Sequence, residues 1–438
     1  MTGPQVDTAG WWTTERAALL GGAEALVAPA LALYGDLHRH PELSGSERRT
    51  AGRLAAWLRE DGFAVTTGVG GHGVVGFLRN GPGPTVLLRC ELDALPVREE
   101  TGLAYASTVT VPGPDGETPV MHACGHDVHV AATSGAARLL ARARKLWRGT
   151  VMVIGQPAEE TLSGARAMVE DGLYDRFGLP SVVLAQHVAP LPAGMVAHAS
   201  GPALAGSLTL RVVLYGRGGH AATPQSNVDP VVMAAAAVMR LQTIVAREVS
   251  PAEQVVVSVG RMRAGAVGNV VADDAELEVT VRALSDASLA RAEEAVRRIV
   301  AAEAAASGSD RPPEVMELSR SSPLVSDPEV SATVLTAHRT SLGAVRVTGW
   351  PPSMASEDVT WLATPPGVPS VPLVYWILGC TGPRQWNATC PGGSATEKMA
   401  ALPPNHSSRF APSPRLTLHT GIAAMGAAAA AWLPTDAG

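Results

Sequence analysis

The chain has 438 residues, of which 46% are hydrophobic, so it is long enough to form two globular domains with separate cores. Its formal net charge is −6 and no run of lysine or arginine forms a basic patch, which argues against nucleic acid as a partner. The N-terminal stretch lacks the basic and apolar regions of a secretory leader, and the alanine-rich run 422–432 is too short to span a bilayer. We therefore expect a cytoplasmic protein with no membrane partner.

The first part of the chain alternates helices with apolar strands. Helical periodicity runs from about Thr14 to Leu37. The residues Pro41 and Ser44 indicate a break, after which a second helix reaches Asp61. Beyond it, β-branched runs predict strands at 74–78, 85–90, 150–156 and 181–187, with helices near 126–145 and 160–172. Such nearly continuous apolar strands are typical of an α/β fold in which a mostly parallel sheet has helices on both faces.

A second pattern begins near Ala203. Strands are predicted at 208–216, 255–263, 275–284 and 313–318, and helices at 229–247 and 286–306. The order β-α-β-β-α-β is that of a ferredoxin-like α+β unit. We therefore predict a catalytic domain in two parts, 1–202 and 323–438, with an inserted domain at 203–322.

The last part carries a strand at 370–379 and a long loop, 380–405, that is rich in proline and glycine. Cys380 and Cys390 either pair or lie free in this loop. Together with Cys90 and Cys124 they are too few in so long a chain to form a disulfide framework. Nothing in the cysteine pattern requires an oxidising compartment.

The stretch M-H-A-C-G-H-D-V-H, residues 121–129, concentrates one cysteine, three histidines and an aspartate. Cys124 and His126 are separated only by Gly125, so both can turn toward one point where a strand leads into a helix. A thiolate and an imidazole together suit zinc and its first-row neighbours. The alternative is a buried, inert cysteine beside a hydrogen-bonded histidine.

Other polar side chains follow the predicted strands, at the edge where ligands bind in parallel sheets. They are Cys90, Glu91 and Asp93 after the strand that ends at Arg89, Glu159 and Glu160 after Gln156, and His187 at the end of its strand. Each has a structural alternative, since Glu159 and Glu160 could begin a helix, Asp93 could cap the turn before Pro96 and His187 could simply be hydrogen-bonded. Taken together with Cys124 and His126, they favour metal-assisted hydrolysis.

Three further positions carry weaker signals. His220 lies on the glycine-rich stretch G-R-G-G-H at the end of a predicted strand, and Asn269 follows a loop. A plain turn explains these glycines as well as a binding site does. His406 lies in a loop, and His38 and His40 are interpreted as structural.

These motifs, in this order, resemble the amidohydrolase branch of metallopeptidase family twenty, which includes aminoacylases, hippurate hydrolases and indole-acetyl-amino-acid hydrolases. The motifs are L-R-C-E-L-D-A-L-P, M-H-A-C-G-H-D-V-H, Q-P-A-E-E, A-Q-H-V, G-R-G-G-H-A-A-T-P, N-V-V, S-E-D and N-H-S. The resemblance extends over nearly the whole chain from about His38 onward. It implies a di-metal exopeptidase-like catalytic domain with an inserted lid and dimerisation domain, hence a homodimer or higher homo-oligomer.

The resemblance also implies roles for individual residues. Two divalent ions, zinc or manganese with cobalt or nickel as alternatives, would be held by Cys124, His126, Glu160, His187 and His406, with the Cys124 thiolate bridging them. Glu159 would be the general base and Asp93 would orient a histidine ligand. His220 and Asn269 would contact the substrate, a small N-acyl amino acid.

The sequence departs from the usual pattern at Glu91, where aspartate is common, at Ala272, where proline is usual, and at Val359, where an aromatic residue is usual. None of these removes a ligand or the base, so we expect activity. Two other functions stay open. One is a di-metal carboxypeptidase or dipeptidase, which typically has an aspartate in place of Cys124; the other is a non-catalytic metal-binding or interaction protein on the same fold.

Overall fold

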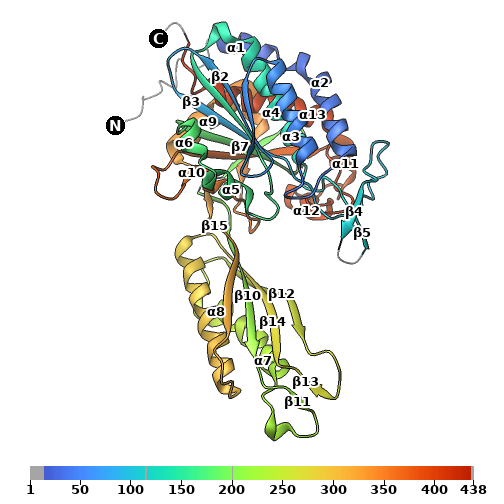
Figure 1. Ribbon diagram of the computed structural model, residues 1–438. Helices are drawn as coiled ribbons and strands as arrows, with labels where there is room; N and C mark the ends of the chain where they lie inside the picture. Colours follow the sequence, from blue (N-terminus) through green and yellow to red (C-terminus); the bar gives the residue numbers. More distant parts are fainter. Residues whose placement is uncertain (1–13, 114–115, 200, 436–438) are drawn as a thin grey trace. The chain divides into compact units, whose positions relative to one another are not determined.

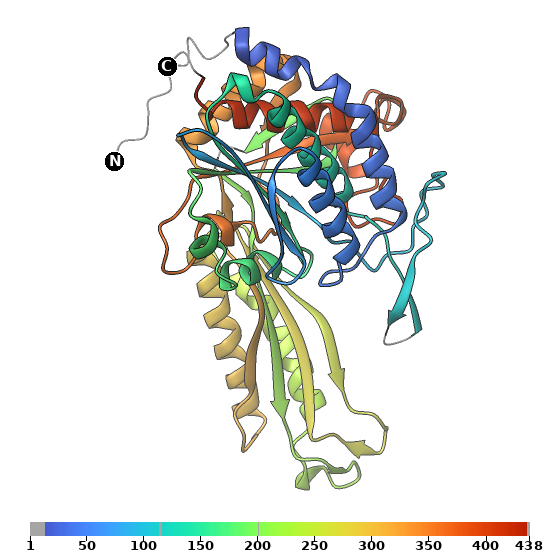
Figure 2. The same ribbon diagram turned by 45° about the horizontal axis from the view of Figure 1, so that its top comes forward.

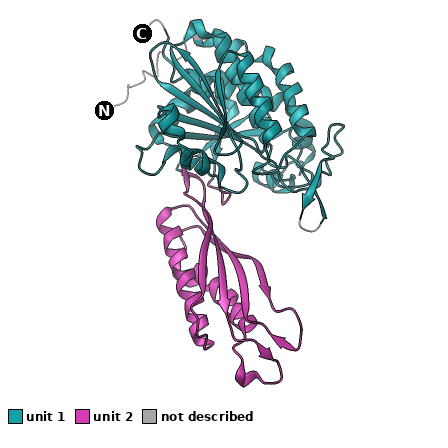
Figure 3. Cartoon of the chain, viewed as in Figure 1, with its two compact units in different colours: residues 1–201, 326–351, 358–438 teal, residues 202–325, 352–357 magenta. Residues whose placement is uncertain are grey.

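The computed structural model describes residues 14–113, 116–199 and 201–435. The chain divides into two compact units, shown in different colours in Figure 3. Unit 1 comprises residues 1–201, 326–351 and 358–438, and unit 2 comprises residues 202–325 and 352–357. The short segment 352–357 thus returns to unit 2 after the chain has re-entered unit 1.

Unit 1 is built on an eight-stranded sheet with the order β1-β2-β6-β3-β7-β18-β8-β17. The four central strands β6, β3, β7 and β18 are mutually parallel, whereas β2 is antiparallel to β1 and β6, and β8 is antiparallel to β18 but parallel to β17. The sheet is therefore mostly parallel, as predicted. Its strands are β1 (Ala64–Val69), β2 (Gly73–Asn80), β3 (Thr85–Glu91), β6 (Gly149–Gln156), β7 (Val182–Pro192), β8 (Val196–Ala199), β17 (Val347–Trp350) and β18 (Leu373–Thr381).

Helices cover both faces of this sheet. Successive residues of a strand point to opposite faces, and on β2 an added Cβ at Gly76 would meet Leu58, whereas the ring of Phe77 stacks on Phe177. In Figures 1 and 2, α2, α4 and α13 lie side by side. The helices are α1 (Thr14–Gly21), α2 (Glu24–Arg39), α3 (Arg48–Glu60), α4 (His126–Arg142), α5 (Gly164–Glu170), α6 (Leu173–Phe177), α9 (Pro328–Leu342), α10 (Thr360–Ala363), α11 (Pro383–Ala388), α12 (Ala395–Ala401) and α13 (Pro414–Ala430).

Unit 2 has the predicted ferredoxin-like order. Its four-stranded antiparallel sheet, β12-β14-β10-β15, carries two helices, and β14 alternates buried with less buried residues because only one face is covered. The elements are β10 (Gly206–Tyr215), α7 (Pro230–Thr243), which continues as a π-helical turn (Ile244–Glu248), β12 (Val255–Ala264), β14 (Asp274–Ala283), α8 (Asp286–Ala306) and β15 (Glu314–Ser321). Two small pairs complete it, β9 (Pro202–Leu204) with β16 (Leu324–Val325) and β11 (Gly219–His220) with β13 (Val270–Val271).

Some local predictions were wrong. The helix predicted from Thr14 to Leu37 is two helices, α1 and α2, interrupted at 22–23. The predicted loop 380–405 contains α11 and α12, and α12 begins with a capping box of Ser394 and Glu397. The strands β1, β8 and β17 and the hairpin of β4 (Thr110–Gly113) and β5 (Gly116–Pro119) were also missed, because these short elements have little hydrophobic periodicity, and the 15-residue helix α9 was missed as well.

The four cysteines are free, so Cys380 and Cys390 do not pair. Cys380 is buried in β18, where its thiol contacts the carbonyl oxygen of Ala189 at 3.0 Å, whereas Cys390 is exposed. Among the described residues one helical stretch, Pro230–Glu248, is apolar and long enough to cross a bilayer. Of this stretch 33% is buried, and its Met233, Ala237 and Leu241 pack into the core of unit 2.

Candidate metal centre

The candidate ligands of unit 1 gather at the carboxyl ends of the central parallel strands. β3 ends at Glu91, β6 ends at Gln156, and α4 begins at His126. β7 was predicted to end at His187, but it continues to Pro192. The turn that carries Cys124 meets these strands because Met121 pairs with Leu95 just beyond β3.

Gly125 shapes the Cys-Gly-His turn. It adopts a left-handed conformation, with φ +84°, at the N-terminus of α4. A Cβ here would lie 2.4 Å from Cγ2 of Val188, so only glycine allows the turn to approach β7. The same turn receives the loop of His406, whose N–H donates to the carbonyl oxygen of Ala123 at 2.8 Å.

His126 is completely buried and held at one nitrogen. Its Nδ1 lies 2.9 Å from the backbone oxygen of Asp93 and 3.2 Å from the Asp93 carboxylate. Its Nε2 has no hydrogen-bond partner among the described residues, and lies 3.7 Å from Glu159 and 3.8 Å from Glu160. A buried imidazole nitrogen that faces two carboxylates fits a cation between them.

Glu159 and Glu160 lie on a shaped turn between β6 and α5. Ala158 has a positive φ of 50°, and its carbonyl oxygen accepts hydrogen bonds from the N–H groups of Ser163 and Gly164. The helix begins only at Gly164, so the glutamate pair lies in a loop, and the alternative that the pair begins a helix does not apply. Their placement is therefore set by the loop.

The Asp93 carboxylate connects this turn to the histidine. One oxygen accepts from the hydroxyl of Ser44 at 2.7 Å and from the N–H of Glu160 at 2.9 Å, and the other faces His126. The side chain therefore joins three segments rather than capping the turn before Pro96. Such a carboxylate fixes the orientation and tautomer of an imidazole ligand.

Cys124, His187 and His406 complete the cluster. The sulfur of Cys124 lies 3.5 Å from Nε2 of His187, and Nε2 of His406 lies 3.3 Å from the Glu160 carboxylate. Ligand atoms of Cys124, Glu160 and His406 all lie within 4.8 Å of one another, as do those of His126, Glu159 and Glu160. Because the two groups share Glu160, the donor set fits two neighbouring cations.

The electrostatics also favour bound positive charge. Burial raises the pKa of the Cys124 thiol, and the charges of Glu160 and Glu159 raise it further, so a thiolate here requires a nearby cation. Burial alone would lower the pKa of His126, but the hydrogen bond to Asp93 and the charge of Glu91 outweigh it and raise the pKa to about 10. Burial lowers the pKa of His187 well below its ordinary value, which keeps its imidazole in the neutral form that binds metals.

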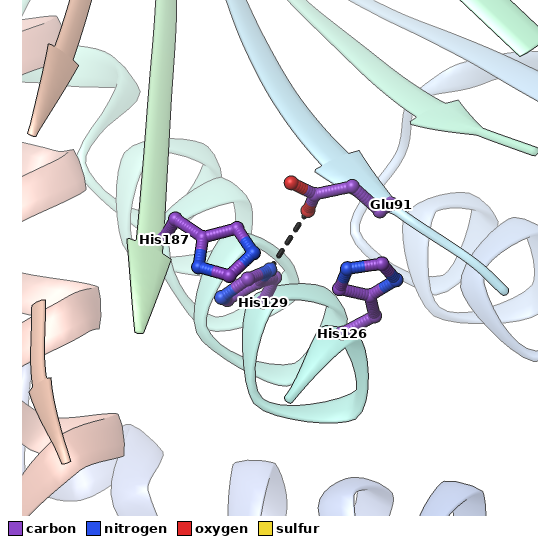
Figure 4. Close-up of side chains that lie close together, drawn as sticks. All are labelled: Glu91, His126, His129 and His187. Atoms are coloured by element: carbon purple, nitrogen blue, oxygen red, sulfur yellow. Dashed lines mark hydrogen bonds and ion pairs between the residues drawn. The ribbon is translucent and has the colours of Figure 1, made fainter. Parts of the chain in front are cut away.

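A further histidine, His129, lies beside His126, His187 and Glu91, as Figure 4 shows. His129, one turn along α4 from His126, contacts the Glu91 carboxylate through Nδ1 at 2.8 Å and receives the N–H of Val188 at Nε2. Its ring lies 4.6 Å from that of His187, centroid to centroid. Both nitrogens of His129 are therefore engaged within the protein.

His220 and Asn269 belong to unit 2, where β11 and β13 bring them together. His220 pairs with Val270, and the N–H of Ala221 donates to the carbonyl oxygen of Asn269 at 3.2 Å. Both side chains are exposed. The Nδ1 of His220 accepts the N–H of Ala222 at 3.0 Å, which leaves Nε2 as the outward nitrogen.

Sequence analysis missed several residues that support the site. Glu47 accepts the N–H of Ala158 at 2.8 Å, and Asn405 donates to the backbone oxygens of Cys124 at 3.2 Å and Val188 at 3.1 Å. The signals were present, because Ser44 and Glu47 lie in the H-P-E-L-S-G-S-E stretch and Asn405 precedes His406. His38 is buried between Asp127 and Glu99, at 2.7 and 3.2 Å.

The fold and the ligand cluster together are those of a metal-dependent hydrolase, and comparison with known proteins agrees. The model of peptidase family M20/M25/M40 matches residues 87–390. Over 281 residues the chain is 37% identical to N-acetylcysteine deacetylase of Bacillus subtilis (strain 168), covering 63% of this chain and 70% of the relative. It is 33% identical over 379 residues to thermostable carboxypeptidase 1 of Saccharolobus solfataricus, covering 85% and 88%.

A solved structure is similar as well. The Bacillus subtilis YXEP protein, described as a dinuclear metal binding peptidase from the M20 family, has a TM-score of 0.69 and 27% identity, covering 92% of this chain and 98% of its own. The chain therefore belongs to peptidase family M20/M25/M40, and it is a hydrolase of that family.

Proposed function

We propose that the protein is a metal-dependent amidohydrolase that cleaves the amide bond of N-acyl amino acids, or related small N-acyl compounds, to a carboxylic acid and an amino acid. The observation that carries the proposal is the shared donor set, in which Cys124, Glu160 and His406 adjoin His126 and Glu159. The similarity to N-acetylcysteine deacetylase supports the substrate class.

Glu159 is the proposed general base. Its side chain is only 7% exposed, so its carboxylate is oriented by the turn between β6 and α5 rather than by solvent. A pair of divalent ions bound at this site supplies Lewis acidity, polarising an amide carbonyl and making water easier to deprotonate. Glu159 takes the proton of the attacking water at its carboxylate and passes it to the departing amine. Glu160 cannot share this role while it ligates, because a carboxylate committed to a cation is a poor base.

Cys124, His126, Glu160, His187 and His406 would hold the divalent ions, with zinc or manganese as the proposed metal. Asp93 orients His126, as its 3.2 Å contact with Nδ1 supports. Unit 2 is the proposed lid and dimerisation unit, and His220 and Asn269 contact the substrate from it. The proposed compartment is the cytoplasm.

A carboxypeptidase or dipeptidase is the second candidate, because a 33% identical relative is named a carboxypeptidase. Cys124 favours the amidohydrolase, since a di-metal carboxypeptidase or dipeptidase typically has aspartate at this position. A binding protein without catalysis is the third, and the presence of Glu159 beside the complete ligand set argues against it.

A hydrolysis screen separates these candidates. The purified protein, loaded with zinc or manganese, is assayed on N-acetyl, N-benzoyl, long-chain acyl and indole-acetyl amino acids, beside unmodified dipeptides and longer peptides. We expect turnover of at least one N-acyl amino acid that exceeds turnover of every peptide. The opposite ranking would establish the peptidase, and turnover of none, with metal bound, would support the binding protein.

A further inference from the structure

Within the 121–129 motif, His129 is the histidine whose two ring nitrogens both have hydrogen-bond partners. It has no part in the proposed reaction. Its imidazole is completely buried, and it lies between the Glu91 carboxylate and the backbone of β7. The N–H of Val188 donates to Nε2 at 2.9 Å, so Nε2 carries the lone pair. Nδ1 therefore carries the proton and donates it to Glu91 at 2.8 Å.

The backbone of β7 needs this partner because a neighbouring strand is missing at this point. The parallel ladder between β3 and β7 ends at the pair Arg89 and Ala185, whereas β7 continues to Pro192. Beyond the end of the ladder, side chains satisfy the polar groups of Val188. His129 accepts its N–H, and His187 and Asn405 donate to its carbonyl oxygen at 2.9 and 3.1 Å.

Two of these contacts lead directly to the metal cluster. The hydrogen bond from Nδ1 of His187 to the Val188 oxygen leaves Nε2 of that ring facing Cys124 at 3.5 Å. Asn405 also donates to the backbone oxygen of Cys124, and it precedes His406 in the chain. The conformation of Val188 therefore sets the orientation of the proposed ligand His187. It also sets the position of the backbone that carries two other proposed ligands, Cys124 and His406.

We propose that His129 is a positioning residue for the metal centre, which holds the Val188 backbone through its neutral imidazole and thereby orients His187, Cys124 and His406. The inference rests on the metal ligands of the proposed function. Glu91 keeps the His129 ring in one tautomer, and Arg89 in turn holds Glu91. Arg89 is buried and also donates to Gln156 at 2.9 Å, so the chain of contacts is anchored in the core.

The geometry distinguishes this role from that of a metal ligand. Each of the four residues drawn in Figure 4, Glu91, His126, His129 and His187, presents an atom within 4.8 Å of the others, and by distance alone they resemble a ligand set. A ligating histidine needs a free lone pair. The lone pair of His129 already accepts the Val188 N–H, so His129 acts through the ligand His187 instead.

Two nearly isosteric substitutions test the proposal. In His129→Gln the amide oxygen can occupy the region of Nε2 and still accept the Val188 N–H, whereas in His129→Asn the shorter amide keeps a donor toward Glu91 but no acceptor for Val188. Zinc affinity is measured by competition with a chromophoric chelator, and zinc content at saturation by mass spectrometry. We expect His129→Asn to weaken zinc binding about 10- to 100-fold, His129→Gln to retain most of the affinity, and both to reach the wild-type content at saturation.

Other outcomes overturn the proposal. Equal affinity in wild type, His129→Asn and His129→Gln would show that His129 only fills space, and equal loss in both variants would show that the acceptor is not what matters. A zinc content at saturation lower by one ion in both would make His129 a ligand. His126→Ala serves as the reference: if it binds as much zinc as the wild type, the proposed function fails, and if it loses zinc while the His129 variants behave as wild type, only this inference fails.

A measurement on the wild-type protein covers the case in which His129→Asn does not fold. In the ¹H–¹⁵N spectrum of protein labelled at histidine, His129→Gln identifies the His129 signals. We expect the Nδ1–H tautomer both without metal and with zinc loaded. An Nε2–H tautomer, a protonated ring, or a metal-bound shift of Nε2 would each contradict the proposal.

Discussion

The metal cluster of unit 1 and the His220 turn of unit 2 are organised in opposite ways. Asp93 and His126 are fully buried, and each is held by partners from distant segments. His220 and Asn269 are exposed and rest on two strands of two residues each. The contrast indicates that the geometry of the proposed ligands is preorganised by burial, whereas the residues proposed to contact the substrate lie on an accessible turn.

The largest effect should follow removal of a buried ligand. We expect His126→Ala and Cys124→Ala to lower metal content from about two ions per chain, as a bridged two-metal site requires, and to abolish turnover. Metal content is measured by mass spectrometry after dialysis. His40→Ala, at an exposed histidine, is the control and should keep its metal. Unchanged metal content and unchanged activity in both ligand variants would show that the metal site of unit 1 has been assigned wrongly.

The adjacent glutamates sharpen the comparison within unit 1. Glu159→Gln should keep its metals and lose turnover by roughly a hundred-fold or more, because a general base has been removed. Glu160→Gln should lose metal as well, because its carboxylate adjoins both ligand groups. Turnover and metal content are measured on the same samples. The reverse pattern would mean that Glu160 is the general base and Glu159 is the metal ligand.

A mixed-dimer experiment tests whether the exposed turn of unit 2 serves the site of a partner chain. His220→Ala and Glu159→Gln should each be nearly inactive alone. If the protein is a symmetric dimer with shared sites, random mixing of equal amounts makes about half the dimers mixed, and roughly a quarter of all sites are then intact. Activity is compared after co-expression, with tagged pull-down to demonstrate heterodimers. No recovery in demonstrated heterodimers would mean that His220 acts within its own chain or does not act at all.

The smallest expected effect concerns two buried histidines that have no role in the proposed reaction. His198 and His338 are in contact at 2.9 Å beside Trp376, and burial lowers their pKa values to about 4 and about 3. Between these values and the unfolded value near 6.5, the unfolded chain binds protons that the folded chain does not, so the free energy of unfolding falls as the pH drops below about 6.5. His338→Gln should reduce this slope by up to about 1.4 kcal/mol per pH unit.

Urea unfolding at several values between pH 7 and pH 4.5 measures this slope. The variant also loses the hydrogen bond from His338 to the carbonyl oxygen of Ala424, which lowers its stability at every pH, so only the slope is compared. Parallel curves for wild type and His338→Gln would mean that the pair does not titrate on unfolding.

Local patterns in the sequence predicted the central strands of unit 1 and the order of elements in unit 2. Apolar runs at 85–90, 150–156 and 370–379 correspond to β3, β6 and β18, and the β-α-β-β-α-β order of unit 2 is the observed one. The spacing of Cys124 and His126 also predicted a turn at the start of α4. These features depend on backbone preferences and on burial, both of which produce a periodic spacing of hydrophobic residues in the sequence.

Only the tertiary structure decided which distant residues support the ligands. Nothing local to His129 indicates that its ring meets Val188 where the β3 ladder ends, and nothing local to Ser44 or Asn405 points to Asp93 or Cys124. Such contacts join positions far apart in the sequence, and they depend on strand order, on where each ladder stops and on how the loops pack. The sequence by itself therefore determined which chemical groups the site contains, whereas packing determined their partners, because burial leaves each polar atom to be satisfied by whichever segment lies nearest in space.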